Sequence, residues 1–121
     1  MAADDGDVIE TGGTLFSGSV GEDRALVDLV PAGEGVTLRT QEWGPGVERG
    51  FGFDTIETTT SIGAHALRVL AFALVGDRPD LDPTLEPIEL VAAAFRGDSA
   101  ASAHVRRRLD ELDLPYELTL R

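Results

Sequence analysis

Few side chains in this sequence are of the kinds that perform catalysis or bind a metal. The chain has no cysteine, which excludes disulfides, thiolate nucleophiles and sulfur-ligated zinc sites. Its two histidines, His65 and His104, fall on different expected helices, and no second metal-ligand side chain lies one helical turn after either of them. Carboxylates are so numerous that no acid–base pair can be singled out. The residue types therefore favour a non-enzymatic protein without a cofactor or a metal.

Four closely spaced glycines, Gly44, Gly46, Gly50 and Gly52, superficially resemble a phosphate-binding loop. Such a loop needs a strand before it and a helix after it, so that backbone amides and the helix dipole meet the phosphate. The sequence instead predicts strands on both sides, and the glycine spacing differs from that of nucleotide-binding motifs. We interpret residues 44–46 as a tight hairpin turn.

The charge of the chain is its most unusual property. Twenty-two acidic residues oppose ten basic ones, all of them arginine, and the net charge is −12. This excess repels the phosphates that dominate nucleic-acid affinity, so we expect no nucleic-acid partner. Two interpretations of the acidity stay open. In the first, the acidity selects a basic protein partner through its electrostatic field. In the second, it reflects the composition of a host proteome that is GC-rich or adapted to high salt.

Trp43, the single tryptophan, is the first candidate for a contact residue. It precedes the expected turn, and a tryptophan on a rigid turn is a typical anchor of protein interfaces; the alternative is a ring that covers the edge of the core. Acidic residues near this turn, and others around the proline-containing loop after the first long helix, would complement a basic partner. The predicted partner-binding residues are Trp43, Glu42, Glu48, Asp54, Asp77, Asp80 and Asp82.

Alternating apolar residues predict strands in the first half of the chain. Residues 14–20, 25–30 and 36–43 each fit one strand. Residues 47–60 are rich in β-branched and aromatic side chains and predict one long strand. The parity of its apolar side chains changes near Asp54, so we expect a bulge or bend there.

The second half of the chain changes to helical spacing. Residues 61–75 fit a helix capped by Ser61, with apolar side chains three and four residues apart. Pro87 suits the first turn of a second helix, and Gly97 suits the position just after its end. A third helix follows, and residues 116–121 alternate again and predict a final strand.

The order ββββαααβ predicts an α+β fold. We expect one antiparallel sheet, built from a four-strand meander and the C-terminal strand, with about three helices packed on one face. The pairing direction of the last strand stays open. Residues 1–12 are expected to be a disordered acidic tail, and residues 13–121 a single domain.

No stretch of the chain reaches the ~20 apolar residues that a membrane-spanning helix needs. The N-terminus is acidic where a signal peptide would be basic, so we expect a cytoplasmic protein without membrane contact.

The hypothesis that these features favour is a binding module for a basic protein, of the immunity, inhibitor or adaptor type. Two alternatives stay open. One is a small enzyme or ligand-binding domain that uses carboxylates in a pocket between sheet and helices. The other is a structural subunit of a homo-oligomer, for instance a homodimer.

Overall fold

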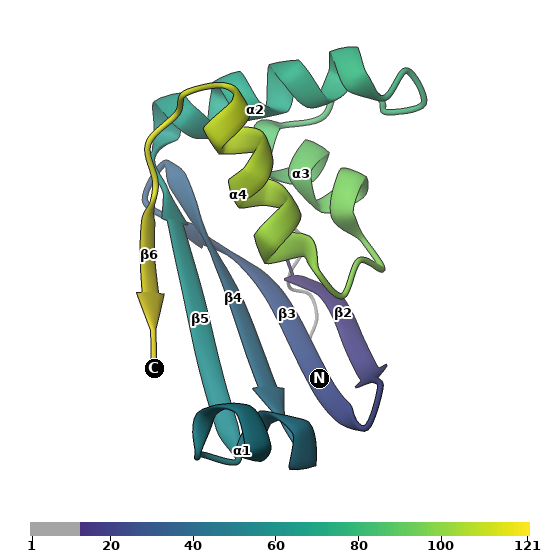
Figure 1. The fold of residues 1–121 in the computed structure, drawn as a ribbon. Helices are drawn as coiled ribbons and strands as arrows, with labels where there is room; N and C mark the ends of the chain where they lie inside the picture. Colours follow the sequence, from purple (N-terminus) through teal and green to yellow (C-terminus); the bar gives the residue numbers. More distant parts are fainter. Residues whose placement is uncertain (1–12) are drawn as a thin grey trace, which may run out of the picture.

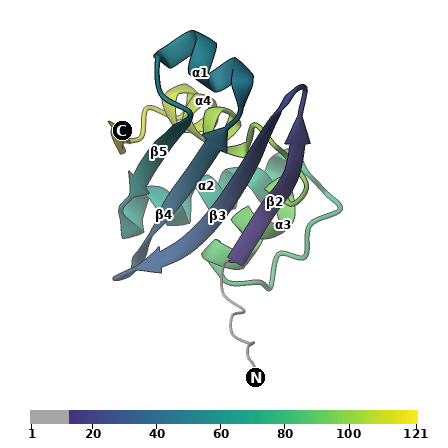
Figure 2. The same cartoon turned by 90° about the horizontal axis from the view of Figure 1, so that it is seen from below.

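The computed structural model describes residues 13–121, and the expected acidic tail of residues 1–12 lies outside the described residues. The chain has an α+β fold in which a five-stranded antiparallel sheet carries helices on one face (Figures 1 and 2). The elements are β2 (Gly13–Val20), β3 (Asp23–Ala32), β4 (Gly35–Trp43), α1 (Pro45–Phe51), β5 (Thr55–Ile62), α2 (Ala64–Asp77), α3 (Pro87–Phe95), α4 (Ala101–Glu111) and β6 (Glu117–Leu120). No helix in the described part is long and apolar enough to cross a membrane.

The strands lie in the sheet in sequence order, β2-β3-β4-β5-β6, and every neighbouring pair is antiparallel. The tight turns before β3 and β4 contain Gly21 and Gly33, whose φ angles of 62° and 61° favour glycine. The last strand, whose direction the sequence left open, pairs antiparallel with β5 and sets Glu117 opposite Ser61. The predicted antiparallel sheet with a returning C-terminal strand is therefore confirmed.

The hydrophobic core lies between the sheet and helices α2, α3 and α4. Val27 and Leu38 from the sheet, Leu70 from α2, Val91 from α3 and Leu109 from α4 are fully buried in one cluster. These residues occupy the inward positions of period-2 strands and of helices with 3- and 4-residue apolar steps. The three predicted helices on one face of the sheet are thus confirmed.

The opposite face of the sheet carries mainly polar side chains, although Leu26 and Val30 of β3 also lie on it. Arg39 of β4 reaches across to both neighbouring strands, with Nη2 3.3 Å from Oδ2 of Asp28 and Nε 3.8 Å from Oε2 of Glu57. An antiparallel sheet with one apolar and one polar face is typical of a sheet covered on a single side.

The helix starts are set by local sequence. Pro87 lies in the first turn of α3, where its missing N–H leaves no bond unmade, and Glu86 and Glu89 cap the helix reciprocally. Gly97 follows the end of α3 with a φ of 86°. The prediction for α2 was wrong at its start, because β5 runs through Ser61 and the N-cap is Gly63. The β-branched run before Ser61 favours continued strand.

The segment after Trp43 is the main correction to the sequence-based prediction. The expected hairpin turn at residues 44–46 and the strand at 47–60 are wrong: α1 (Pro45–Phe51) occupies this region, and β5 starts only at Thr55. Pro45 opens the helix, where its fixed φ is already helical. Gly52 ends it in the left-handed conformation, with its N–H bonded to the carbonyl of Glu48. Propensity for strand was overridden by these two terminal signals.

Candidate functional site at the α1 end of the sheet

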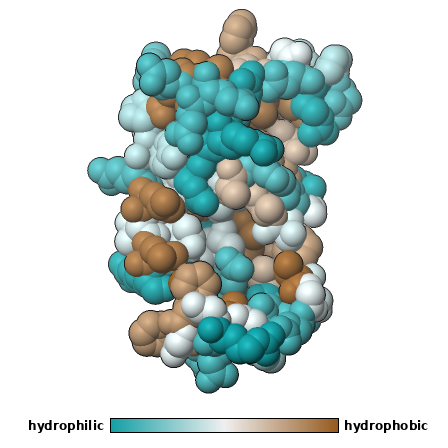
Figure 3. Space-filling view, in the orientation of Figure 1, coloured by the Kyte–Doolittle hydropathy of each residue, from teal (hydrophilic) through white to brown (hydrophobic). Residues whose placement is uncertain are grey.

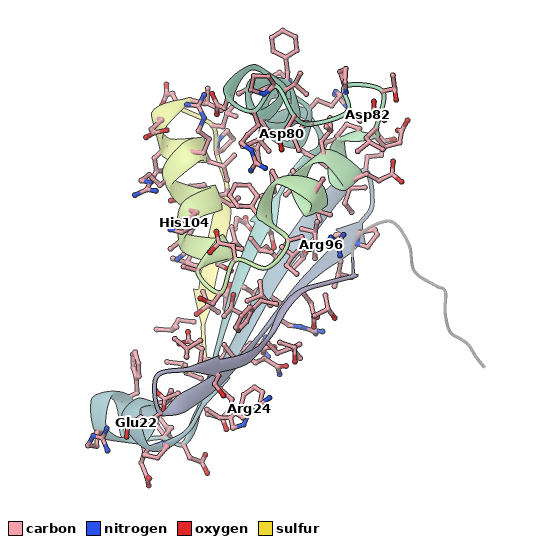
Figure 4. The ribbon with its side chains drawn as sticks, turned by 90° about the vertical axis from the view of Figure 1, so that its right-hand side faces the viewer. Glu22, Arg24, Asp80, Asp82, Arg96 and His104 are labelled. Atoms are coloured by element: carbon pink, nitrogen blue, oxygen red, sulfur yellow. The ribbon has the colours of Figure 1, made fainter. Side chains whose placement is uncertain are left out.

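The seven predicted contact residues lie near opposite ends of the molecule. The first group, around α1, is Glu42, Trp43, Glu48 and Asp54, and the second, around the loop after α2, is Asp77, Asp80 and Asp82. Figure 4 shows this separation, with Asp80 and Asp82 at one end and Glu22, in the turn before β3, at the other. The structure therefore does not bring the predicted residues into one site.

Two of the loop acids are bound to arginines of the same chain. Asp77 accepts hydrogen bonds from Nε and Nη2 of Arg108 at 2.8 and 3.0 Å. Asp80 accepts hydrogen bonds from Nε and Nη2 of Arg78 at 3.1 and 3.0 Å, and this bonding lowers the pKa of Asp80. Two-point contacts of this kind are the geometry in which guanidinium and carboxylate fit best. The charges of both acids are therefore already offset within the protein.

Asp82 organises the loop itself. Its Oδ1 accepts hydrogen bonds from the backbone N–H of Thr84 at 3.0 Å and from the Thr84 hydroxyl at 2.7 Å. The backbone bond, followed by the hydroxyl bond, lowers the pKa of Asp82. An aspartate that bonds the backbone two residues later stabilises a turn. The loop acids thus have structural roles with which a partner would have to compete.

The acids at the α1 end are in a different situation. Within residues 13–121, neither Glu42 nor Glu48 has a hydrogen-bond or ion-pair partner for its side chain. Within the same residues, the side chain of Asp54 accepts one hydrogen bond, from the hydroxyl of Thr55, its neighbour in the chain, at 3.5 Å. A carboxylate without a bound cation can offer its full charge to a partner. These three predicted residues are the ones that remain available for contact.

Exposed aromatic side chains accompany these acids. Phe53 is 70% exposed, Phe51 55% and Trp43 37%. Large aromatic side chains in water carry a cost that burial in an interface removes, and clusters of them mark binding surfaces. The sequence-based prediction missed Phe51 and Phe53, because it placed them on one face of a long strand. The signal that could have found them was Pro45 followed by an acidic residue, which is typical of a helix start.

The short helix that carries this surface is fastened to the strand next to it. Oδ1 of Asp23 accepts a hydrogen bond from the backbone N–H of Gly46 at 2.8 Å. Glu22 forms an ion pair with Arg49. Val47 is buried beneath the helix. The exposed side chains of α1 therefore stand on a fixed support, and not on a free loop.

The surface at this end wraps around the tip of the sheet. Glu42 and Trp43 are consecutive in β4, so their side chains point to opposite faces. Glu42 lies opposite Ile56 on the face that carries the helices, and Trp43 lies opposite Thr55 on the polar face. We call the set Glu42, Trp43, Glu48, Phe51, Phe53 and Asp54 the α1 patch.

A groove of about 260 Å³ lies beside the α1 patch, between the sheet and the start of α4. Helices α2, α3 and α4 cover only the part of the sheet away from α1, which leaves this part of the sheet open (Figure 1). The buried hydroxyls of Thr40 and Ser102, both lining the groove, bond to each other, and Nη1 of Arg106 donates to the Thr60 hydroxyl at 2.9 Å. Glu42 is the one carboxylate in the lining. The groove therefore offers polar contacts but no pair of carboxylates.

A second hollow, of about 520 Å³, lies among α2, α3 and α4. Nδ1 of His104 is 2.6 Å from Oδ2 of Asp98, and the lining also holds Arg78 and Arg108, which are bound to acids. His65 lies exposed on α2 and does not line this hollow. In the described part of the chain, no three metal-ligand side chains cluster. Among the pairs in this lining, Arg108–Asp77 joins α4 to α2.

No protein-family model matches the chain, and no curated protein and no solved structure was found to match it.

Proposed function

We propose that the protein is a non-enzymatic binding module that engages a basic protein partner through the α1 patch. One observation carries the proposal: carboxylates that have no partner within residues 13–121 stand beside exposed aromatic side chains on a fixed support. Aromatic anchors surrounded by polar groups are the usual composition of a protein–protein contact.

The composition of the patch supports a partner that carries both apolar and basic side chains. Phe51 and Phe53 would pack against apolar side chains of the partner. The neighbouring Glu48 and Asp54 would bind its arginine or lysine side chains. The net charge of −12 would accelerate the encounter with a cationic protein at low salt. A partner segment that alternates basic and apolar residues satisfies both requirements. An immunity or inhibitor protein for a cationic toxin and an adaptor for a basic segment are the two roles that fit.

The alternative of a carboxylate site between sheet and helices receives little support. The core between sheet and helices is built from apolar side chains, and the buried polar residues among those described are Thr40, Thr60 and Ser102. The groove at the α1 end of this interface has Glu42 as its one carboxylate, which leaves it without a carboxylate pair. Hydroxyls that bond to each other or to Arg106 stabilise the interface and supply no general acid or base.

Matched pairs of variants test the proposal. The protein is used to capture partners from its native host, and the captured protein is then titrated with purified variants. We expect Phe53→Ala and Glu48→Arg each to weaken binding by about tenfold or more. Phe72→Ala and Glu34→Arg serve as controls, since Phe72 is 83% exposed on α2 and Glu34 lies in the turn before β4. If the two members of each pair weaken binding equally, the α1 patch is not the contact surface.

A further inference from the structure

The two edges of the sheet differ in how their outer backbone groups are occupied. At β2, the carbonyl of Leu15 accepts a hydrogen bond from the N–H of Gly97 at 2.7 Å, and the register shifts between Thr14 and Phe16. At β6, no backbone hydrogen bond within residues 13–121 reaches the outer side of the strand. Figure 1 shows β6 at the margin of the sheet with no element beyond it. An open edge of this kind can pair with another strand.

The register of β6 determines which backbone groups point outward. Arg121 and Glu57 of β5 exchange both backbone hydrogen bonds, at 3.0 and 2.8 Å. In an antiparallel ladder, such pairs recur at every second residue. Thr119 therefore also bonds inward, towards Thr59, which leaves the N–H and C=O groups of Leu118 and Leu120 directed away from the sheet.

The side chains on this edge are also unusual for a strand in contact with water. Leu118 is 53% exposed and Leu120 60%. They lie opposite Thr60 and Thr58, on the face that carries the helices, and apolar side chains are visible over β6 in Figure 3. Edge strands are usually protected by charges, proline or a covering loop. Here the outward backbone groups belong to apolar residues.

We propose that β6 pairs antiparallel with β6 of a second copy of the chain, which joins the two sheets around a twofold axis at Thr119. This register pairs Leu118 with Leu120 of the second copy, and each such pair exchanges both backbone hydrogen bonds. Since every residue keeps its face, the four leucines meet on the helix-bearing side. On the polar side, Glu117 lies opposite Arg121 of the second copy, and the symmetry repeats this contact.

The sequence of the strand makes this register self-complementary. The centre pairs threonine with threonine, the next positions pair leucine with leucine, and the ends pair opposite charges. A register moved by two residues would set Glu117 opposite Thr119 and Pro115 opposite Arg121, which removes the charge pairs. Two features thus indicate that a second copy of this chain pairs with the open edge of β6. They are the opposite charges of Glu117 and Arg121 and the outward-directed backbone amides. This proposal does not involve the α1 patch.

The contact is short, so the dimer is weak. Interfaces much smaller than ~1,200 Å² belong to transient complexes, and we expect half-association at roughly 100 µM. Sedimentation velocity between about 10 µM and about 1 mM should show a reversible shift from monomer to dimer. A protein that stays monomeric up to about 1 mM overturns the proposal.

A proline variant tests the outward backbone groups of β6 without affecting the groups that bond to β5. Leu118→Pro removes an outward N–H without removing a bond to β5, and proline is tolerated on edge strands at such positions. We expect this variant to keep its fold, checked by circular dichroism, and to lose dimerisation by tenfold or more. If Leu118→Pro does not fold, hydrogen exchange in the unmodified protein decides. The amides of Leu118 and Leu120 should be protected at about 1 mM and exchange freely at about 10 µM, and equal exchange at both concentrations overturns the proposal.

Charge reversal tests the register. Glu117→Arg and Arg121→Glu each place like charges opposite one another twice, so each variant alone should associate about tenfold more weakly. An equal mixture of the two variants restores both opposite-charge pairs and should recover the association. Arg121 also lies opposite Glu57 of its own chain, so Arg121→Glu alone could loosen β6; recovery on mixing excludes that explanation. A mixture that associates no better than its components refutes the register.

Discussion

Tyr116, the only tyrosine of the chain, connects the end of α4 to the segment that leads into β6. Its hydroxyl donates to Asp110, with distances of 3.0 Å to Oδ1 and 3.3 Å to Oδ2. This hydrogen bond, then burial and the negative charge of Asp110, raise the pKa of Tyr116, while Arg106 acts in the opposite direction. A group whose pKa is raised on folding stabilises the fold fully below its unfolded pKa, here about 10. That stability is lost as pH rises through the folded-state pKa.

We therefore expect the tyrosinate absorbance of the folded protein to develop with a midpoint above pH 10.0, the ordinary pKa of tyrosine. Asp110→Ala should lower the midpoint towards the ordinary value, because it removes both the acceptor and the charge. The titration reports one residue, since the chain has a single tyrosine. Far-ultraviolet circular dichroism, recorded in parallel, separates titration from alkaline unfolding. Identical midpoints in the two proteins would show that the contact with Asp110 does not persist in solution.

For individual residues, the sequence identified candidate acidic side chains but did not show which of them are paired with arginines and which are not. Residue type and position suggested Glu48 and Asp77 alike. Asp77 is held by Arg108, which is 31 positions away in the chain, whereas Glu48 has no partner for its side chain among residues 13–121. A contact across that separation depends on how α2 and α4 pack, and no local pattern encodes it. The sequence therefore predicted an acidic surface without locating it.

At the scale of elements, α1 depends on a residue outside itself. Its N-cap, Gly44, makes no side-chain capping bond, and the N–H of Gly46 is bonded instead by Asp23 at the start of β3. Loss of a helix cap typically costs about 1 kcal/mol. Asp23→Ala should lower the free energy of unfolding by about this amount and accelerate amide exchange within α1 more than within the sheet. Glu34→Ala, which makes the same change in charge in another turn, is the control.

Denaturant unfolding and hydrogen exchange measure the two effects. If Asp23→Ala and Glu34→Ala alter exchange in α1 equally, then the carboxylate of Asp23 does not hold the helix. A variant that loses α1 but keeps the sheet would also give a direct test of whether the α1 patch needs a helical support.

The elements that the sequence predicted correctly are those whose periodicity is set by burial. Leu38 alternates with the polar residues Thr37 and Arg39 in its strand, and Leu70 and Leu74 follow a helical stripe, so pattern and packing agree. α1 was missed because it is short and rich in glycine, and its start is held by Asp23, 23 residues away. As a consequence, Phe51 and Phe53, which were expected within a long strand, lie exposed on the surface. Strand propensity was outweighed here by Pro45 and Gly52 at the helix ends together with the distant side chain of Asp23.

At the scale of the whole molecule, the acid excess acts both as attraction and as repulsion. Asp77 and Asp80 are paired with arginines, whereas Glu42 and Glu48 add to a net charge of −12 without such a partner in the described part. Self-repulsion destabilises a compact state, and exposed ion pairs stabilise it by less than about 1 kcal/mol each. Because the unpaired excess is large, we expect repulsion to dominate at low ionic strength.

Raising potassium chloride from about 0.01 M to about 1 M shortens the screening length from about 30 Å to about 3 Å. The midpoint of thermal unfolding should therefore rise with salt, as it would for a protein adapted to a saline host.

Two double variants with the same change in net charge separate the effect of repulsion from the effect of ion pairing. Glu42→Gln with Glu48→Gln should raise the low-salt midpoint and flatten its salt dependence, since neither acid has an ion-pair partner within residues 13–121. Asp77→Asn with Asp80→Asn should lower it, because two arginines lose their partners. A midpoint that falls with added salt in the unmodified protein would mean that the ion pairs outweigh the repulsion. In that case the unpaired acids at the α1 end would cost the fold little.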